Sequence, residues 1–498
     1  MRPVRLPEYD RLDATALAGL VASGEVTPLE LLEAAVERVE ARNPRLNAVV
    51  HRFDDDARRR AAGIIPAGPF RGVPLLVKDL VALVEGQPAT GSCRLFEGVV
   101  SPVDSETVRR FRGAGFLLFG QTNTPELGLL PVTEPRLRGP TRNPWNPEHT
   151  PGGSSGGAAA AVAARMVPLA HGNDGGGSIR IPASACGLFG LKPTRARTSF
   201  APAYGDLWAG LVQEHVLTRS VRDSAGVLDA VAGPAPGDPY VAPPPARPFR
   251  EEVGAPPGRL RVAFDTGSLF GHTVHPGCAA AVRDAARLLS DLGHEVVEAR
   301  PRFDREQLVR AYLVIIAAYT RAELETGCRR ARRALDLSLV EPETAGLAAA
   351  GRVLSADDLA GAVNSAQAAS REVAAFFSRH DLFLTATMAH PPARVGAFAL
   401  RPWERVQVQA VTRLPFRTVV DRLLREVAGR AFEATGNTML FNITGQPAAS
   451  LPLSWNDAGL PVGVQLAARF GDEAALFRVA SQLEAARPWA DRVPPLAA

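Results

Sequence analysis

Lysine is scarce in this chain, and its two lysines are the first candidates for acid–base chemistry. Of 56 lysine and arginine residues, all but Lys78 and Lys192 are arginines. Arginine cannot give up its proton in a protein, whereas a buried lysine can. Lys78 lies in the apolar run 72–79 (GVPLLVKD), which predicts a buried strand, and burial lowers the pKa of an amine. We therefore expect Lys78 to act as a neutral base, and Lys192 to be structural.

Two loops rich in glycine and serine supply the candidate nucleophile. The first is GGSSGG at 152–157, and the second is DGGGS at 174–178. Between them, an alanine-rich run predicts a helix and MVPLA at 166–170 predicts a strand. About ten helical residues travel roughly 15 Å, and about five strand residues return roughly 16 Å. We therefore expect Ser154 and Ser178 to lie side by side at one edge of a sheet.

The glycines before Ser178 predict how a carbonyl group would be held. Consecutive glycines leave several backbone N–H groups unobstructed by side chains, which is the form that an oxyanion hole takes. A serine at the end of such a loop is a candidate nucleophile, and it needs a base. Because a hydroxyl can both donate and accept, Ser154 could relay a proton between Ser178 and Lys78.

A serine–histidine–aspartate hydrolase is the rival interpretation. The GGSSG pattern around Ser154 matches a nucleophile elbow. That elbow needs a strand before the serine, but RNPWNPEHTP at 142–151 contains three prolines and is a poor central strand. No histidine has a distinctive context: His171 suits a structural role at a strand end, and the pair His272 and His275 has no third metal ligand. The Gly/Ser segment also matches neither nucleotide-binding glycine motif.

Hydrophobic periodicity predicts the elements that must position these residues. At 27–43, threonine at an N-cap, proline at the first helical position and apolar residues at helical spacing predict an amphipathic helix. The proline- and glycine-rich stretch 233–258 predicts an extended connector. Strands alternating with helices predict an α/β fold with a largely parallel or mixed sheet covered on both faces. Further strands are expected at 115–120, 259–264, 294–299, 381–387 and 461–468, and further helices at 276–292, over most of 305–380 and at 472–486.

Composition excludes several classes of protein. With 498 residues, 46% of them hydrophobic and 22% charged, the chain has ample material for a core and is not disordered. Its net charge of +4, without blocks of like charge, argues against a nucleic-acid or membrane-surface protein. No apolar run approaches the roughly 18 residues of a membrane span, and the N-terminus lacks a signal peptide's apolar region. Four widely spaced cysteines suggest neither a disulfide framework nor a zinc site, so we expect a cytoplasmic protein.

Several of these segments together resemble the amidase signature family. The resemblance implies one α/β domain over 1–498, built on a large mixed β-sheet flanked on both faces by α-helices. Its catalytic core would span about 70–230 and 435–490, and a variable, substrate-shaping region would span about 235–435. The matching segments are GVPLLVKD (72–79), GQTNTPELG (120–128), PGGSSGG (151–157), HGNDGGGSIRIPASACGLFGLKPT (171–194) and, more weakly, FNITGQPAASLP (441–452) and PVGVQLAA (461–468).

The resemblance also implies a mechanism without cofactor or metal. Ser178 would attack an amide carbonyl and form an acyl-enzyme. Ser154, whose peptide bond is cis in the family, would relay the proton to Lys78. The N–H groups that would form the oxyanion hole are those of Gly175, Gly176, Gly177 and Ser178. In the commoner family pattern a bulkier residue takes the first place in this glycine run.

Other residues receive supporting roles from the same resemblance. Ser155 would support Lys78, while Asp174 and Arg180 would brace the nucleophile loop and take no part in the chemistry. The helical region 305–380 would contribute to an acyl pocket for an uncharged, partly apolar amide. Further pocket candidates are Leu127, Gly128, Pro131 and Trp145.

Within the family, the RNPWN, HGND and RIPASACG blocks resemble hydrolytic amidases of the 6-aminohexanoate-cyclic-dimer hydrolase type. The cysteine that such enzymes carry near the substrate falls at 312–319 (YLVIIAAY), where this chain has none. We expect hydrolysis of a small-molecule amide, such as a lactam or an aryl or alkyl amide, by a monomer or homodimer without nucleic-acid or membrane partners. The alternative is the A subunit of a tRNA-dependent amidotransferase, which releases ammonia from glutamine within a larger complex.

Overall fold

One mixed sheet of eleven strands organises the part of the chain that this computed structural model describes, namely residues 6–413, 417, 432–433 and 435–497. The strand order is β1-β3-β2-β4-β6-β5-β10-β11-β9-β7-β8. Strand β2 pairs in parallel with β3 and β4, as β7 does with β8 and β9, and the other pairs are antiparallel. The strands are β1 Val49–Arg52, β2 Pro74–Lys78, β3 Leu117–Thr122, β4 Leu169–Asp174, β5 Phe189–Lys192, β6 Gln213–Thr218, β7 Arg261–Phe264, β8 Glu295–Glu298, β9 Leu382–Ala386, β10 Ala448–Trp455 and β11 Pro461–Ala468.

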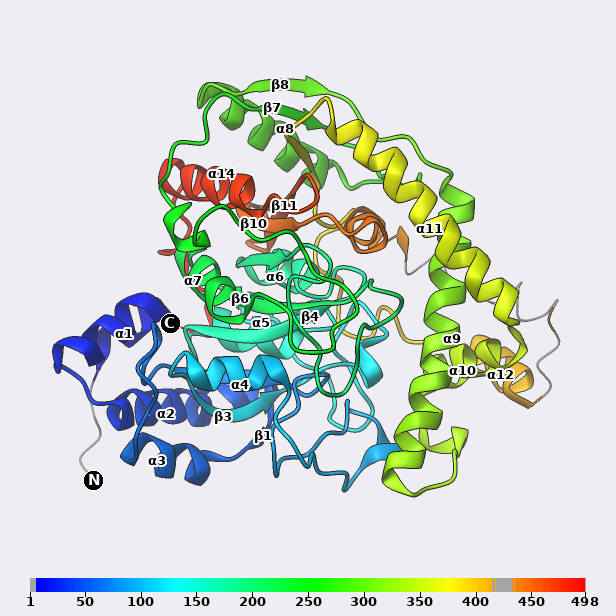
Figure 1. The fold of residues 1–498 in the computed structure, drawn as a ribbon, viewed down its shortest axis with the longest axis horizontal. Helices are drawn as coiled ribbons and strands as arrows, with labels where there is room; N and C mark the ends of the chain where they lie inside the picture. Colours follow the sequence, from blue (N-terminus) through cyan, green and yellow to red (C-terminus); the bar gives the residue numbers. More distant parts are fainter. Residues whose placement is uncertain (1–5, 414–416, 418–431, 434, 498) are drawn as a thin grey trace.

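Helices surround this sheet, and the longest ones stand apart at one side. In Figure 1, α9, α10, α11 and α12 gather on the right, whereas α1, α2 and α3 lie at the opposite side of the sheet. None of the helices in the described ranges has the length and apolar character needed to cross a bilayer. The helices are α1 Ala14–Ser23, α2 Pro28–Leu46, α3 Asp54–Ala62, α4 Glu106–Gly113, α5 Gly156–Ala163, α6 Arg180–Cys186, α7 Val221–Val231, α8 Pro276–Asp291, α9 Arg305–Ala331, α10 Pro342–Val353, α11 Ala356–Phe377, α12 Pro402–Arg413 and α14 Glu473–Ala486.

Alternating burial in β9 shows that helices cover both faces of the sheet. Successive side chains of a strand point to opposite faces. Leu382 and Leu384 belong to an apolar core shared with α8 and α14, while Phe383 belongs to a second core shared with α9 and α11. The predicted α/β fold with a mixed sheet flanked on both faces is therefore confirmed.

The helix after the first glycine loop is confirmed, but the strand predicted at 166–170 is misplaced. Strand β4 begins at Leu169 and ends at Asp174, so it includes three polar residues, His171, Asn173 and Asp174, that an apolar pattern does not reveal. His171 is fully buried there because its Nε2 pairs with Glu214 Oε1 at 3.0 Å on the neighbouring strand β6. Because β4 ends at Asp174, the second glycine loop starts directly at the end of a central strand.

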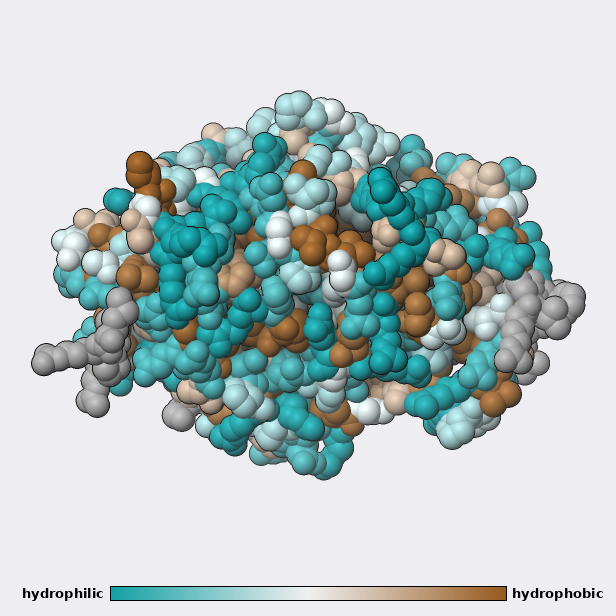
Figure 2. Space-filling model, turned by 90° about the horizontal axis from the view of Figure 1, so that it is seen from below, coloured by the Kyte–Doolittle hydropathy of each residue, from teal (hydrophilic) through white to brown (hydrophobic). Residues whose placement is uncertain are grey.

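The face of the molecule shown in Figure 2 gives little indication of a site. Hydrophilic side chains cover most of the face shown in Figure 2, and the apolar groups on it are small and separated. Exposed large hydrophobic residues come from unrelated segments, as Ile64 after α3 and Trp403 in α12 illustrate. Such scattered exposure is ordinary for a globular protein. The chemistry must therefore be sought in the interior, at the ends of the central strands.

Candidate active site

Lys78 is the last residue of β2, and its side chain is fully buried. Its Nζ lies 2.7 Å from Ser154 Oγ and 2.6 Å from Asn173 Oδ1. Within the described residues, Lys78 takes part in no ion pair. Burial lowers the pKa of this amine well below its ordinary value, and the more distant carboxylates of Asp174 and Glu214 oppose this shift only in part. Lys78 thus has the burial and the hydroxyl partner that a lysine base needs.

Asn173 orients the amine of Lys78. Sequence analysis did not identify Asn173. Its Nδ2 donates to Leu80 O at 3.0 Å, which turns its Oδ1 toward Lys78 Nζ. Because Oδ1 can only accept, Nζ donates one hydrogen to Asn173. The lone pair of the neutral amine is then available to the hydroxyl of Ser154. The HGND sequence could have indicated Asn173, because residues 171 and 173 of a strand lie on the same face.

The first glycine loop brings Ser154 to Lys78 and connects to the second loop. The peptide bond between Gly153 and Ser154 is cis. Ser155 N donates to Ser178 O at 3.2 Å, and Ser155 Oγ donates to Asn173 O at 3.2 Å. Ser155 therefore contacts the backbone on both sides of the site, and its link to Lys78 runs through Asn173. Ser154 and Ser178 line the same cavity.

The second loop offers fewer oxyanion donors than expected. Gly175, Gly176 and Ser178 line the cavity, whereas Gly177 does not. The N–H of Gly177 donates to Asp174 Oδ1 at 2.7 Å, so this donor is already engaged. The expectation that all four N–H groups form the oxyanion hole is thus corrected for Gly177. The N–H groups of Gly175, Gly176 and Ser178 remain candidate donors, because these residues line the cavity.

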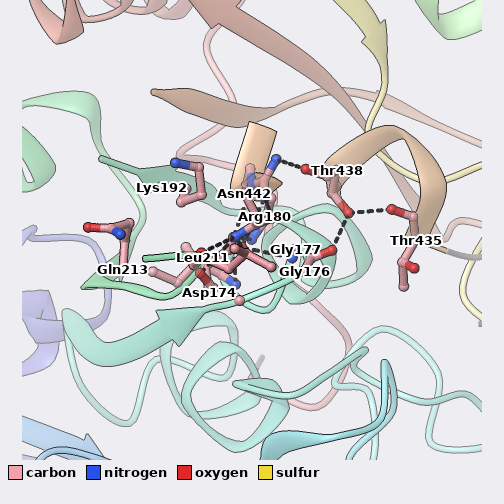
Figure 3. A network of polar contacts seen from close by, with 12 residues as sticks. Asp174, Gly176, Gly177, Arg180, Lys192, Leu211, Gln213, Thr435, Thr438 and Asn442 are labelled. Atoms are coloured by element: carbon pink, nitrogen blue, oxygen red, sulfur yellow. Dashed lines mark hydrogen bonds and ion pairs between the residues drawn. The ribbon is translucent and has the colours of Figure 1, made fainter. Parts of the chain in front are cut away.

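A buried ion pair holds this loop in place (Figure 3). Arg180 Nε and Nη2 each lie 2.9 Å from a carboxylate oxygen of Asp174, and both residues are fully buried. Arg180 also donates to Thr438 O at 2.7 Å and to Asn442 Oδ1 at 2.6 Å. Burial raises the pKa of Asp174, but the adjacent guanidinium outweighs this and holds the pKa below its ordinary value. The geometry supports the bracing role expected for Asp174 and Arg180.

Close packing explains why three glycines precede Ser178. A Cβ on Gly175 would lie 2.9 Å from Trp208 Cζ3, and a Cβ on Gly176 would lie 2.3 Å from Tyr312 Oη. Gly177 has a φ of +128°, which disfavours any other residue, and a Cβ on it would lie 2.2 Å from Thr438 Oγ1. A side chain at any of these three positions would therefore force neighbouring side chains from distant segments to move.

The histidines are engaged elsewhere, which argues against the rival serine–histidine mechanism. His171 Nδ1 accepts from the backbone N–H of Lys78 at 3.3 Å. Its Nε2 therefore carries the proton that is shared with Glu214 Oε1. His275 caps the start of α8, where its side chain accepts from a backbone N–H. Neither imidazole contacts Ser154 or Ser178.

A cavity of about 900 Å³ opens over the two serines. This volume lies within the range of roughly 300 to 1,000 Å³ that is usual for small-molecule sites. The predicted residues Leu127, Gly128 and Pro131 line it, together with side chains of α9 and α10. The expected contribution of the helical region 305–380 is thus present.

Trp145 was expected to line the same cavity, and it does not. Its Nε1 donates to Cys186 O at 2.8 Å, and its ring packs against Trp455 with centroids 5.8 Å apart. Because both its polar atom and its ring are satisfied by the protein, its role is structural. Trp208, which sequence analysis missed, lines the cavity instead.

Known proteins resemble this chain along nearly its whole length. The family model described as Amidase matches residues 30–477. The chain is 39% identical over 491 residues to the 6-aminohexanoate-cyclic-dimer hydrolase of Pseudomonas sp. (strain NK87), covering 97% of this chain and 96% of that protein. A solved structure of 6-aminohexanoate cyclic dimer hydrolase matches with a TM-score of 0.89 and 38% identity, over 98% of this chain and 99% of that one. The A subunit of the glutamyl-tRNA(Gln) amidotransferase from Thermotoga maritima matches less well, with a TM-score of 0.75 and 26% identity, over 98% and 99% of the two chains.

Proposed function

This chain belongs to the amidase family, and we propose that it hydrolyses its amide substrate through an acyl-enzyme on Ser178. It is a hydrolase that acts on carbon–nitrogen bonds other than peptide bonds. One observation carries the assignment of its catalytic residues. The buried Nζ of Lys78 lies 2.7 Å from Ser154 Oγ, beside a cavity that Ser154 shares with Ser178.

In the proposed first half-reaction, Ser178 Oγ attacks the carbonyl carbon of the amide. Its proton passes to Ser154, whose own proton passes to the neutral amine of Lys78. The carbonyl electrons move onto oxygen, and the N–H groups of Gly175, Gly176 and Ser178 stabilise that charge. When the carbonyl re-forms, the C–N bond breaks and the leaving nitrogen takes back the proton from Lys78 through Ser154.

In the second half-reaction, water takes the place of the leaving amine. The same relay removes a proton from this water as its oxygen attacks the acyl carbon of the ester. The C–O bond to Ser178 then breaks, and Ser178 Oγ recovers its proton. The products are a carboxylic acid and an amine, and the relay is restored. Arginine could not serve this cycle, because it does not lose its proton in a protein.

The cavity supports an amide with an apolar body, such as a lactam or an alkyl or aryl amide. The relative from Pseudomonas is named for a cyclic dimer of 6-aminohexanoate, so cyclic amides belong in the substrate screen. The segment 312–319 contributes Tyr312 and Ile316 to the cavity and contains no cysteine. We place the enzyme in the cytoplasm, which four free, buried cysteines support.

The amidotransferase alternative has weaker support, because the likeness to that protein is at 26% identity against 39% for the hydrolase. The two functions differ in their partners. We expect the purified chain to hydrolyse amides without other subunits, ATP or tRNA. Co-purification with other subunits, together with activity only in their presence, would favour the alternative.

Labelling with a fluorophosphonate tests the proposed nucleophile. We expect peptide mass spectrometry to locate the adduct on Ser178, since only an activated serine reacts rapidly. Ser178→Ala should abolish labelling and Lys78→Ala should slow it strongly, while heat-denatured protein serves as the control for unspecific reaction. An adduct on Ser154, or none on the folded protein, would contradict the proposal.

A further inference from the structure

Helix α9 lines the cavity with one face over three turns. Tyr312, Ile316, Tyr319 and Glu323 all line it, and their spacing of four, three and four residues places them on one side of a helix. Tyr312 Oη donates to Gly175 O at 3.3 Å and thus touches the oxyanion loop. The backbone of Glu323 lies about 16 Å farther along the axis of α9 than that of Tyr312, and helical side chains lean toward the N-terminus of their helix. The cavity therefore extends from the reacting serines along α9 to a carboxyl group.

Glu323 lies among aromatic side chains without a cationic partner. The side chain of Trp208 interacts with its carboxyl group and opposes the effect of burial on its pKa. After burial, the charge of Glu323 raises the pKa of Tyr204, and the charges of Asp206 and then Glu323 raise the pKa of Tyr319. Among the described residues, Glu323 forms no ion pair, and burial raises its pKa to about 7. A carboxyl group in such surroundings is costly to ionise unless a cation joins it.

Trp208 lines the cavity and lies in a strained stretch of backbone. Trp208 and Ala209 both have a φ of +52°, in the left-handed region. This conformation costs roughly 1 to 2 kcal/mol for each residue, and such strain clusters at functional sites. One edge of the indole packs against Gly175, and the same side chain interacts with Glu323. The indole therefore lies between the oxyanion loop and the part of the cavity that holds Glu323.

The charges around the cavity also favour a cation. Asp79 is already satisfied, because Thr90 and Ser92 donate to its carboxylate. The guanidinium of Arg330 lies over the ring of Tyr204, 5.8 Å from its centroid, within the range of a cation–π contact. Acids thus dominate the charged residues that line the cavity in the described part of the chain, which are Asp79, Asp206, Glu323, Glu343 and Arg330.

We infer that Glu323 is a specificity-determining residue that binds a protonated amine of the substrate. The preferred substrates are then amides in which an apolar chain separates the scissile carbonyl from a terminal ammonium group. This inference rests on the proposed function, because Ser178 defines where the carbonyl lies. It refines the sequence-based expectation of an uncharged amide: the body of the substrate is apolar, and its far end is cationic.

Binding of simple ligands tests the ammonium site without any reaction. Octylamine, octanol and octanoate share one chain and differ in charge, and calorimetry on the whole protein measures their affinities. We expect octylamine to bind about tenfold more tightly than octanol, and octanoate to bind most weakly. Glu323→Gln, which keeps an acceptor for Trp208, should remove the preference for octylamine. Glu325→Gln is the matched control on the same helix, because Glu325 pairs with Arg321 at 2.7 Å and does not line the cavity.

Equal affinities for octylamine and octanol, or a preference that survives Glu323→Gln, would overturn the inference. A kinetic comparison separates this failure from failure of the proposed function. Two amides of one chain length, ending in ammonium or in methyl, should differ about tenfold in kcat/KM, and Glu323→Gln should collapse the ratio. Hydrolysis of both amides at equal kcat/KM would refute the ammonium site and leave the amidase assignment intact. Tight amine binding without hydrolysis of any amide would refute the proposed function and leave the site intact.

Discussion

Lys78 and Lys192 are alike in burial and differ in what they contact. Each ends a strand of the same sheet, β2 or β5, each is fully buried, and burial lowers the pKa of each well below its ordinary value. Lys78 Nζ contacts Ser154 and Asn173, whereas Lys192 Nζ donates to Pro193 O at 2.7 Å. Figure 3 shows Lys192 beside the Asp174 and Arg180 network, with no interaction drawn to it. Burial lowers the pKa of both amines, but only Lys78 contacts a hydroxyl group whose proton it can accept.

The largest expected effect separates the two lysines by activity. Lys78→Ala should lower kcat/KM by roughly 10⁴-fold or more, because removing one member of a catalytic triad has effects of this size. Lys192→Ala should leave kcat/KM within about tenfold once its folding has been verified by circular dichroism. Steady-state hydrolysis of an anilide measures both. Full activity of Lys78→Arg would refute the neutral-amine mechanism, because arginine keeps its proton.

Removal of the relay should have the next largest effect. Ser154→Ala leaves Lys78 buried but takes away the hydroxyl that connects it to Ser178, so we expect kcat to fall by about 10² to 10⁴-fold. Fluorophosphonate labelling of Ser178 should slow in parallel. Ser184→Ala provides a control at another buried serine, whose hydroxyl bonds the backbone of Gly463. Unchanged labelling in Ser154→Ala would show that the proton of Ser178 leaves by another route.

A smaller effect is expected from changing the partner of Lys78. Asn173→Asp would place a carboxylate beside Nζ, and an adjacent opposite charge raises the pKa of an amine by about 1 to 3 units. Since only the neutral amine is active, kcat/KM at neutral pH should fall about tenfold or more, and the acid limb of the pH profile should move to higher pH. Recovery of activity at alkaline pH distinguishes this from structural damage. If the acid limb does not move in Asn173→Asp, the group that titrates there is not Lys78.

The smallest effect concerns stability, and here the two lysines should behave alike. Each amine has a lower pKa in the folded than in the unfolded chain, so between these two values the unfolded chain binds one more proton. The free energy of unfolding should therefore rise with pH by about 1.4 kcal/mol per unit for each lysine in that window, and by nothing outside it. Lys78→Met and Lys192→Met should each remove one such contribution from urea unfolding measured across the window. If Lys192→Met leaves the slope of the unfolding free energy against pH unchanged, burial does not neutralise the amine of Lys192.

Local sequence patterns were sufficient to predict the elements that carry the triad candidates. The apolar run before Lys78 predicted a buried strand, and the alanine-rich run after the first loop predicted a helix. The approach of Ser154 and Ser178 to one cavity followed from these two elements, although β4 itself was placed too early. Predictions of this kind succeed because helix and strand periods are set by neighbouring residues.

Contacts between distant segments could not be predicted in this way. Asn442 joins Arg180 across 262 positions of the chain, and Glu323 reaches the cavity only because α9 packs over the second loop. The engagement of Gly177 by Asp174 depends on the exact course of a loop, which composition does not specify. Trp145 was misassigned because an aromatic residue near a motif fits a pocket and a structural contact equally well. Tertiary packing and the exact course of loops decided these cases.

The scarcity of lysine permits a direct test of the central claim. Lysine labelled with carbon-13 at Cε would give two signals in this chain, and Lys192→Arg would assign them. The Cε shift of Lys78, followed against pH, reports whether its amine carries a proton. We predict a neutral amine at the pH of full activity, with its titration well below that of an ordinary lysine. A Lys78 signal that remains that of an ammonium group at this pH would contradict the proposed mechanism.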